Sequence, residues 1–141
     1  MKKILIINAN YYNDISNNLY LSAKKVLKSR KIKISVINVA GVFEIPVIIR
    51  KHIKKFDGFI ALGCVIKGET SHYQYISEST FYGIMKISIE FGKPVGNGII
   101  TAQNLKQAKA RSNLKNSAKP NKGSEAAKAV ISVMIGKPKK K

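Results

Sequence analysis

The chain has 141 residues, of which 45% are hydrophobic, and this suits one compact domain with a sizeable core. No apolar run approaches the roughly 20 residues that a membrane-spanning helix needs, and the apolar stretch after Met1 is only of strand length, without the cleavage pattern of a signal peptide. A single cysteine, Cys64, excludes an intrachain disulfide, so we expect a reduced, cytoplasmic protein.

The formal net charge of +19 raises the question of nucleic-acid binding, because a basic surface is the electrostatic footprint of phosphate recognition. Almost all of this charge is lysine, since the arginines are Arg30, Arg50 and Arg111. Plentiful isoleucine and asparagine indicate a bias of codon composition, and the lysines are expected to be dispersed over helical faces. We therefore expect no specific nucleic-acid partner and no membrane partner, while nonspecific RNA binding at low salt stays open.

Four apolar runs of strand length alternate with segments of helical period. The runs cover residues 4–9, 32–39, 59–66 and 95–101. The helices are expected at residues 13–30, 44–55, 71–91 and 104–135, the last broken near Pro120. Right-handed crossovers would place helices on both faces, so the sequence predicts an α/β protein, a three-layer α/β/α sandwich with a four-stranded parallel sheet. Residues 1–136 would form this single domain, and residues 137–141 a solvated basic tail.

Local signals predict where two of these helices begin. Asp14 or Ser16 would cap the first helix, and Pro46 suits the opening turn of the second, where its missing N–H costs nothing. The apolar residues 47–49 are expected to be buried against the sheet.

The chemically versatile residues follow the strands. In open α/β sheets ligands bind beyond the carboxyl ends of the strands, and here those ends carry Asn10–Tyr12, Gly41–Glu44, Gly68–His72 and Thr101–Asn104. We expect Gly68 to let the chain turn. Thr70 or Ser71 would then cap the next helix, whose first N–H groups suit a phosphate.

His72 falls in the first turn of that helix. Histidine titrates near neutral pH and so suits a general acid and base, although a solvated surface histidine is the competing interpretation. The sequence has no GxGxxG, no P-loop and no Cys/His cluster at zinc spacing, so we expect neither a cofactor nor a metal.

Five segments, in order, resemble the 6,7-dimethyl-8-ribityllumazine synthase family of riboflavin biosynthesis. They are Gly41–Pro46, Gly63–Tyr75, Pro94–Thr101, Gln107-Ala108 with Arg111, and Asn121–Gly123 with Glu125–Ala127. The resemblance covers nearly the whole chain and implies a flavodoxin-like fold. It also implies a transferase that condenses 5-amino-6-(D-ribitylamino)uracil with 3,4-dihydroxy-2-butanone 4-phosphate to 6,7-dimethyl-8-ribityllumazine, phosphate and water.

The resemblance assigns roles to individual residues. His72 would move protons, and Arg111 with the backbone N–H groups of Glu69 and Thr70 would bind the phosphate. The pyrimidine and ribityl groups would be held by Tyr12, Val42, Phe43, Glu44, Cys64, Val65, Ile66, Asn97 and Lys122. Tyr11 is the rival of Tyr12 as the stacking aromatic. From the residues alone, Glu44 is equally a helix N-terminal acid and Arg111 a helix-end charge.

Two positions depart from the family pattern: Asn97 stands where many members have phenylalanine, and Lys67 stands where arginine is usual. An amide at position 97 can still bond the uracil edge. Other readings of the same fold are an archaeal-type riboflavin synthase, which would use two lumazine molecules, and a non-catalytic flavin- or lumazine-binding protein. A grip on phosphate by Arg111 favours the lumazine synthase, since neither alternative holds a butanone phosphate.

The family's active sites lie between the subunits of a homopentamer, and many members stack twelve pentamers into a shell. Here the first strand begins almost at Met1, and the connection at residues 112–120 is long and contains Pro120. We therefore expect a free pentamer, with a pair of stacked pentamers as second choice.

Overall fold

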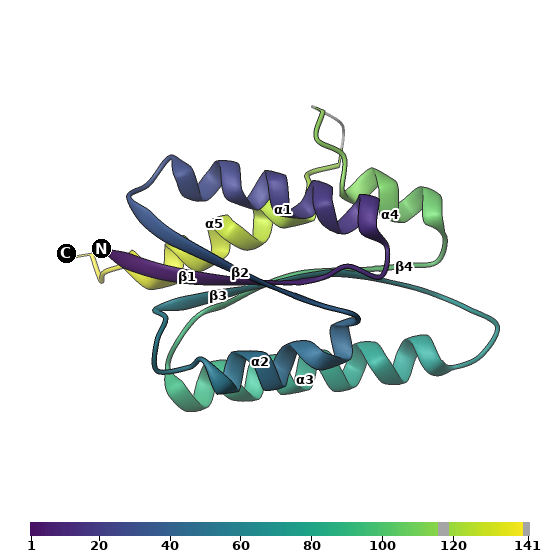
Figure 1. The fold of residues 1–141 in the computed structure, drawn as a ribbon, viewed down its shortest axis with the longest axis horizontal. Coiled ribbons are helices and arrows are strands. Elements are labelled where there is room, and N and C mark those ends of the chain that lie inside the picture. Colours follow the sequence, from purple (N-terminus) through teal and green to yellow (C-terminus); the bar gives the residue numbers. More distant parts are fainter. Residues whose placement is uncertain (116–118, 140–141) are drawn as a thin grey trace.

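The computed structural model describes residues 1–115 and 119–139. Its four strands, β1 (Lys2–Ala9), β2 (Ile32–Val39), β3 (Gly58–Ile66) and β4 (Val95–Ala102), form one parallel sheet in the order β2-β1-β3-β4. α1 (Asn13–Lys28) and α5 (Lys122–Ile135) cover one face, and α2 (Ile45–Lys51) and α3 (His72–Phe91) cover the other (Figure 1). The predicted three-layer sandwich is confirmed.

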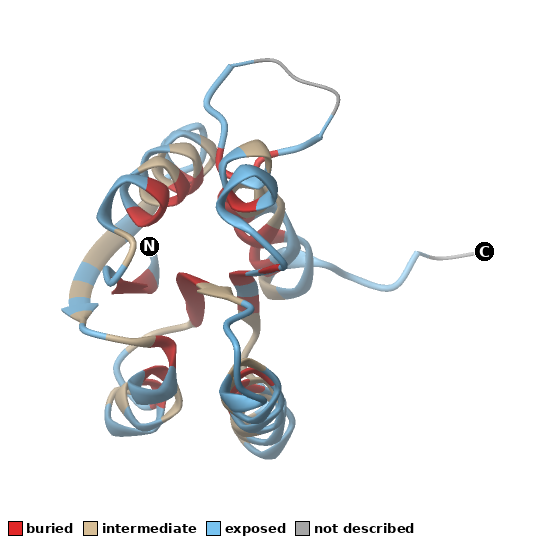
Figure 2. Cartoon of the chain, turned by 90° about the vertical axis from the view of Figure 1, so that its right-hand side faces the viewer, coloured by how far each residue is buried: buried red, intermediate tan, exposed pale blue. Residues whose placement is uncertain are grey.

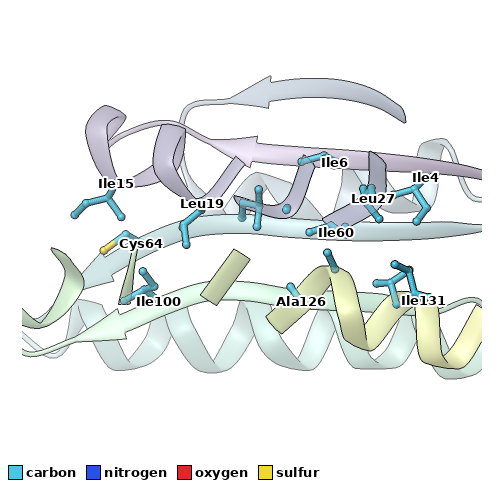
Figure 3. Packing of buried hydrophobic residues seen from close by; sticks show 14 of the residues in the cluster. Ile4, Ile6, Ile15, Leu19, Leu27, Ile60, Cys64, Ile100, Ala126 and Ile131 are labelled. Atoms are coloured by element: carbon cyan, nitrogen blue, oxygen red, sulfur yellow. The ribbon is translucent and has the colours of Figure 1, made fainter. Parts of the chain in front are cut away.

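The sheet separates two hydrophobic cores. Ile4 and Ile6 of β1 point into the core beneath α1 and α5, whereas Leu5 and Ile7 point into the core above α2 and α3. Successive strand side chains face opposite ways, so a strand covered on both faces needs a continuous apolar run. Figure 3 shows the first core, where Leu19 and Leu27 of α1 pack over the strands. This two-sided burial is why the strands could be recognised from composition.

α1 begins differently from the prediction. Tyr12 is the N-cap residue and no side chain caps the helix, so the expectation of Asp14 or Ser16 is wrong. The Ser16 hydroxyl instead donates to the carbonyl oxygen of Asn13 at 3.1 Å. Asp14 lies in the first turn, where its charge still complements the helix dipole.

The segment after β2 is also shorter as an α-helix than expected. Val42–Glu44 forms a 3₁₀ turn, and α2 then occupies only Ile45–Lys51, with Pro46 in its first turn as predicted. Ile49 is fully buried, but Val47 is 58% exposed. The prediction that Val47 packs against the sheet is wrong, because a helix turns a new face every residue and cannot bury three in a row on one sheet.

The last helical stretch is broken as predicted. α4 (Leu105–Arg111) ends before the connection that contains Pro120, and α5 follows it. Asn104 caps α4 by accepting from the N–H of Gln107, and Asn121 caps α5 by accepting from the N–H groups of Gly123 and Ser124. The expectation of a long connection at residues 112–120 falls partly on residues 116–118, which lie outside the described residues.

The parallel arrangement gives the sheet two unlike edges. The N-terminus and the end of α5 lie at the amino edge, where the strands begin, and the loop before α3 and the loop before α4 lie at the carboxyl edge (Figure 1). Figure 2 looks onto the carboxyl edge and shows exposed outer surfaces of the helices around the buried centre of the sheet, with the edge strand β2 intermediate to exposed. Lysines lie on each of the helices α1 to α5, and others gather at the amino edge, where helices end and strands begin. No described helix has the length and apolar character required to cross a membrane.

Candidate active site

A cleft of about 570 Å³ opens at the carboxyl edge of the sheet. Three consecutive strand-to-helix connections, after β1, β2 and β3, contribute to it, so residues far apart in sequence meet as the parallel topology predicts. The predicted residues that line it are Tyr12, Val42, Phe43, Glu44, Cys64, Val65, Ile66 and His72. The structure therefore brings together eight of the predicted site residues on one cleft.

Gly63 shapes the floor of this cleft. A Cβ atom at this position of β3 would lie 2.6 Å from Cγ1 of Val42 and 3.0 Å from Cβ of Ala9, both of which line the cleft. Such contacts are too short, so only glycine lets the two residues pack over the strand. The floor is thus an apolar surface close to the backbone of β3.

Glu44 carries a carboxylate into this apolar setting. It occupies the N-cap position of α2 but makes no capping hydrogen bond with its side chain. Its Oε2 atom would lie 3.6 Å from a Cβ at Gly41, which places the carboxylate over the turn that precedes it. Because the helix does not use this carboxylate, it is free to accept hydrogen bonds from a ligand. Phe43, beside it, is 61% exposed.

Tyr11 and Tyr12 form a pair at the mouth of the cleft. Their ring centroids are 4.9 Å apart, and the ring planes meet at 83°. Tyr12 is half-buried, and burial, followed by charge interactions with Cys64 and Tyr11, raises the pKa of its hydroxyl. Tyr11 is 78% exposed. Both rings line the cleft, so the choice between them as the stacking aromatic is not decided by position alone.

Cys64 lies at the cleft wall with little exposed surface. Burial raises the pKa of its thiol to about 11. The neutral thiol is therefore the form present near pH 7, and a neutral thiol is a poor nucleophile. Cys64 is a small apolar wall residue, as expected.

His72 is the first residue of α3 and is exposed at the cleft. Its backbone N–H donates to Oγ1 of Thr70 at 3.3 Å, whereas Ser71, the N-cap residue, makes no capping bond. Gly68 lies in the connection between β3 and α3, with open space where a Cβ would be and without the left-handed conformation. Glu69 and Thr70 are exposed and line a second hollow of about 420 Å³.

The remaining predicted residues lie elsewhere. Asn97, Arg111 and Lys122 line a third cavity of about 220 Å³ beside β4. None of the three lines the cleft that holds His72 and Glu44. Within one chain, the structure does not bring the predicted phosphate-binding guanidinium to the predicted acid and base.

The cleft also contains residues that sequence reasoning did not assign. Ile76 lines it and lies four residues after His72, so the two share one face of α3. The four-residue spacing from His72 could have predicted from the sequence that Ile76 lines the same site. Ala9 and Gly41 also line the cleft. Their place near the cleft could be inferred from the predicted strand ends, but neither residue has a side chain that would mark it as part of a site. Among the described residues there is no group of three or more His, Cys, Asp or Glu side chains that could hold a metal ion.

A parallel α/β sheet whose carboxyl edge gathers a histidine, a carboxylate and aromatic rings around a cleft is typical of an enzyme that acts on a small molecule. The sequence pattern of the 6,7-dimethyl-8-ribityllumazine synthase family matches residues 1–136. The chain belongs to this family and is a transferase of riboflavin biosynthesis.

Individual relatives agree with this assignment. The 6,7-dimethyl-8-ribityllumazine synthase of Bartonella bacilliformis is 37% identical over 132 residues, which cover 91% of this chain and 85% of the relative. The synthase of Novosphingobium aromaticivorans is 36% identical over 136 residues, which cover 95% of each chain. That of Corynebacterium urealyticum is 35% identical over 129 residues, covering 92% of this chain and 80% of the relative.

Proposed function

We propose that the cleft binds 5-amino-6-(D-ribitylamino)uracil and that 3,4-dihydroxy-2-butanone 4-phosphate reacts with it there. The observation that carries this proposal is the meeting of His72, Glu44 and Phe43 on one cleft in a chain of this family. The products are 6,7-dimethyl-8-ribityllumazine, phosphate and water. The cleft's volume of about 570 Å³ is in the range of small-molecule sites and has room for a planar ring and a polyol.

The polar residues of the cleft suit the two ends of the pyrimidine substrate. Glu44 accepts hydrogen bonds from ribityl hydroxyls, and the backbone groups of Val42 and Phe43 lie beside it. Tyr12 stacks on the ring, and the backbone of Cys64–Ile66 bonds the ring edge. The unused carboxylate of Glu44 supports the first role, since no helix cap competes for it.

His72 acts as the general acid and base. The amine of the pyrimidine adds to the ketone carbonyl, and loss of water gives an imine. Phosphate then leaves by elimination, and the second amine closes the ring with loss of another water. Each step moves a proton, and His72 lies exposed at the cleft, where a single imidazole can donate and accept in turn.

The phosphate is bound at the turn before α3. The backbone N–H groups of Glu69 and Thr70 donate no hydrogen bond within the part of the chain that the structure describes, so both are available to an anion. Gly68 leaves open space beside them. The charge of the phosphate is balanced by Arg111, whose guanidinium can make a bidentate contact.

Because Arg111, Asn97 and Lys122 lie in a separate cavity, they serve the cleft of a neighbouring subunit. Such a contact is heterologous and closes into a ring, and we propose a pentamer. We further propose that residues 1–136 form one domain followed by a basic tail at 137–141. The extent of the family match supports this division. A reduced, buried Cys64 is compatible with a cytoplasmic location.

The test is to mix the purified protein with both substrates and to follow lumazine absorbance together with phosphate release. We expect equal amounts of the two products. A control reaction supplies lumazine alone, and riboflavin formation in it would contradict the proposal by favouring a riboflavin synthase. Native mass spectrometry of the same sample measures assembly, and an active monomer would contradict the shared site.

A further inference from the structure

The amino edge of the sheet carries a concentration of positive charge that the active site does not use. Exposed lysines lie where strands β1 and β2 begin, namely Lys2, Lys3, Lys31 and Lys33, and Lys93 precedes β4. More follow the ends of the helices at the same edge, including Lys28, Lys51, Lys54 and Lys55. Lys137 and Lys139 follow the end of α5 (Figure 1). We call these residues together the basic pole.

Acidic residues are nearly absent from this edge. The chain has seven in all, and only Asp57 and Glu90 lie near the basic pole. The carboxylate of Asp57 already accepts a hydrogen bond of 2.8 Å from the backbone N–H of Lys3. The other five lie in the carboxyl-edge loops or in the first two turns of helices, namely Asp14, Glu44, Glu69, Glu78 and Glu125. The two edges of one small domain are therefore charged very differently.

The register of the sheet aligns three of the lysines. Lys3 and Lys33 are direct partners in the ladder of β1 and β2. The N–H of Asp57 donates to the carbonyl oxygen of Lys3, and continuing the pairing of β3 with β4 by two residues sets Lys93 beside Asp57. Neighbouring strands lie about 4.8 Å apart. The row therefore holds three lysines and the carboxylate of Asp57, and the half-buried ammonium of Lys93 also donates to the carbonyl oxygen of Ile53. Together with the other exposed lysines of the basic pole, Lys3 and Lys33 match a linear array of negative charges better than a single anion.

The general attraction of lysine to helix ends explains only part of this pattern. Cations near a helix C-terminus are stabilised by the helix dipole, which accounts for Lys28 and Lys51. No dipole favours lysines at the start of a strand, since sheet dipoles largely cancel. Lys2, Lys3 and Lys33 thus repel one another, the single carboxylate of Asp57 beside Lys3 offsets only part of this repulsion, and an external polyanion would relieve the rest.

We propose that the basic pole is a docking surface for the phosphate backbone of nucleic acid. Recognition is independent of sequence, because the aromatic rings near the pole are not free to stack on bases. Phe91 is half-buried under the guanidinium of Arg50, 4.8 Å from its centroid, and Phe56 is half-buried between His52 and Phe59. Lysines without accessible aromatic rings beside them bind the phosphate charges of the backbone and do not distinguish between bases. The cleft at the opposite edge stays open to substrates.

The binding test uses the full chain and a fluorescently labelled single-stranded RNA of about 30 nucleotides, long enough to cover several phosphate contacts. We expect affinity to fall steeply as salt rises from about 50 mM to 200 mM, and to be unchanged when the RNA sequence is permuted. Affinity that does not respond to salt would overturn the proposal. So would tight binding to vesicles that contain phosphatidylserine with no binding to RNA.

Matched variants locate the surface. The pole variant combines Lys2→Gln, Lys3→Gln, Lys31→Gln and Lys33→Gln, and the control combines Lys86→Gln, Lys106→Gln, Lys109→Gln and Lys128→Gln, all exposed positions. Both lose the same charge. We expect the pole variant to bind RNA at least about tenfold more weakly, with a salt slope smaller by roughly 3, because each lost contact to a single strand removes about 0.7. Its rate of lumazine formation should be unchanged.

The control variant should stay within about twofold of the unmodified chain in RNA affinity, since its lysines lie away from the aligned row. Equal weakening of both variants would show that net charge alone attracts RNA and would overturn the basic pole as a surface. A second variant combines Lys54→Gln and Lys55→Gln. Both residues lie in a turn outside every helix and strand, so we expect the substitutions to leave the fold intact. This variant should show a smaller loss of RNA affinity than the pole variant. An unchanged RNA affinity would count against the proposal.

Discussion

The cleft at the carboxyl edge and the cavity beside β4 contain complementary chemistry in separate places. The cleft offers one carboxylate, one histidine and apolar walls. The cavity beside β4 offers two cations, Arg111 and Lys122, and an amide, with no carboxylate. No residue lines both. The difference fits the proposal that one chain holds two half-sites, which are completed by contact between copies of the chain.

The largest effect is expected from the cavity beside β4. Arg111→Ala should raise KM for the butanone phosphate by about 10²-fold or more, because an anion loses a charge-assisted bidentate contact. KM for the pyrimidine should change little. Arg111→Lys should recover part of the loss, since an ammonium cannot reproduce the planar fork. Steady-state kinetics with each substrate varied in turn measure the split. Equal increases for both substrates would reassign Arg111 to a structural role.

The next effect tests the cleft. His72→Ala should lower kcat by about 10²-fold, the low end of general acid and base catalysis, because holding the substrates together supplies much of the acceleration. KM for both substrates should stay near its original value. Single-turnover measurements separate the chemical step from binding, and an unchanged single-turnover rate would remove His72 from the mechanism.

A smaller but more diagnostic effect comes from mixing the two half-sites. His72→Ala damages only the cleft, and Arg111→Ala damages only the cavity beside β4. If the site joins the cleft of one chain to the cavity of its neighbour, random co-assembly should restore about one quarter of the original activity, since that fraction of contacts pairs two intact halves. Co-expression followed by an activity assay measures the recovery. No recovery in rings verified to be mixed would place both halves in one chain.

The smallest effect concerns Cys64. Alkylation by iodoacetamide should have a midpoint near pH 11 in the folded protein, since burial raises the thiol pKa to about 11. The neutral thiol is favoured by the fold, so this contribution to stability is present below the unfolded thiol pKa and is lost as pH rises through the folded value. Cys64→Ala should leave kcat near its original value. Rapid alkylation near pH 7 would contradict a buried, inactive wall residue.

Elements buried on both sides could be predicted closely. β3 (Gly58–Ile66) is found within one residue of its predicted bounds because a strand covered on both faces needs an apolar run, and that run is visible in the sequence. Positions that depend on local backbone geometry were harder to predict. The 3₁₀ turn at Val42–Glu44 and the exposed Val47 depend on how the chain enters α2, which composition does not specify.

The candidate active site likewise has features that the sequence predicts and features that it does not. The meeting of Glu44 and His72 follows from strand order and the rule that ligands bind at the carboxyl edge. The separation of Arg111 from them was expected only from the family resemblance, because spacing along the chain does not say which side of β4 a helix end faces. The pairing of Lys3 with Lys33 could not be predicted in this way, because it depends on the sheet register, which composition does not specify.

Asn97 has a consequence for how the free chain behaves in a crowded cell. β4 is an edge strand, and edge strands with unpaired backbone groups are templates for aggregation. The N–H of Ile99 donates to Oδ1 of Asn97 at 3.1 Å, so the side chain occupies a group that a foreign strand would otherwise pair with. We therefore expect this hydrogen bond to make the edge a poorer template for fibre-like association, an effect that a phenylalanine at this position could not supply.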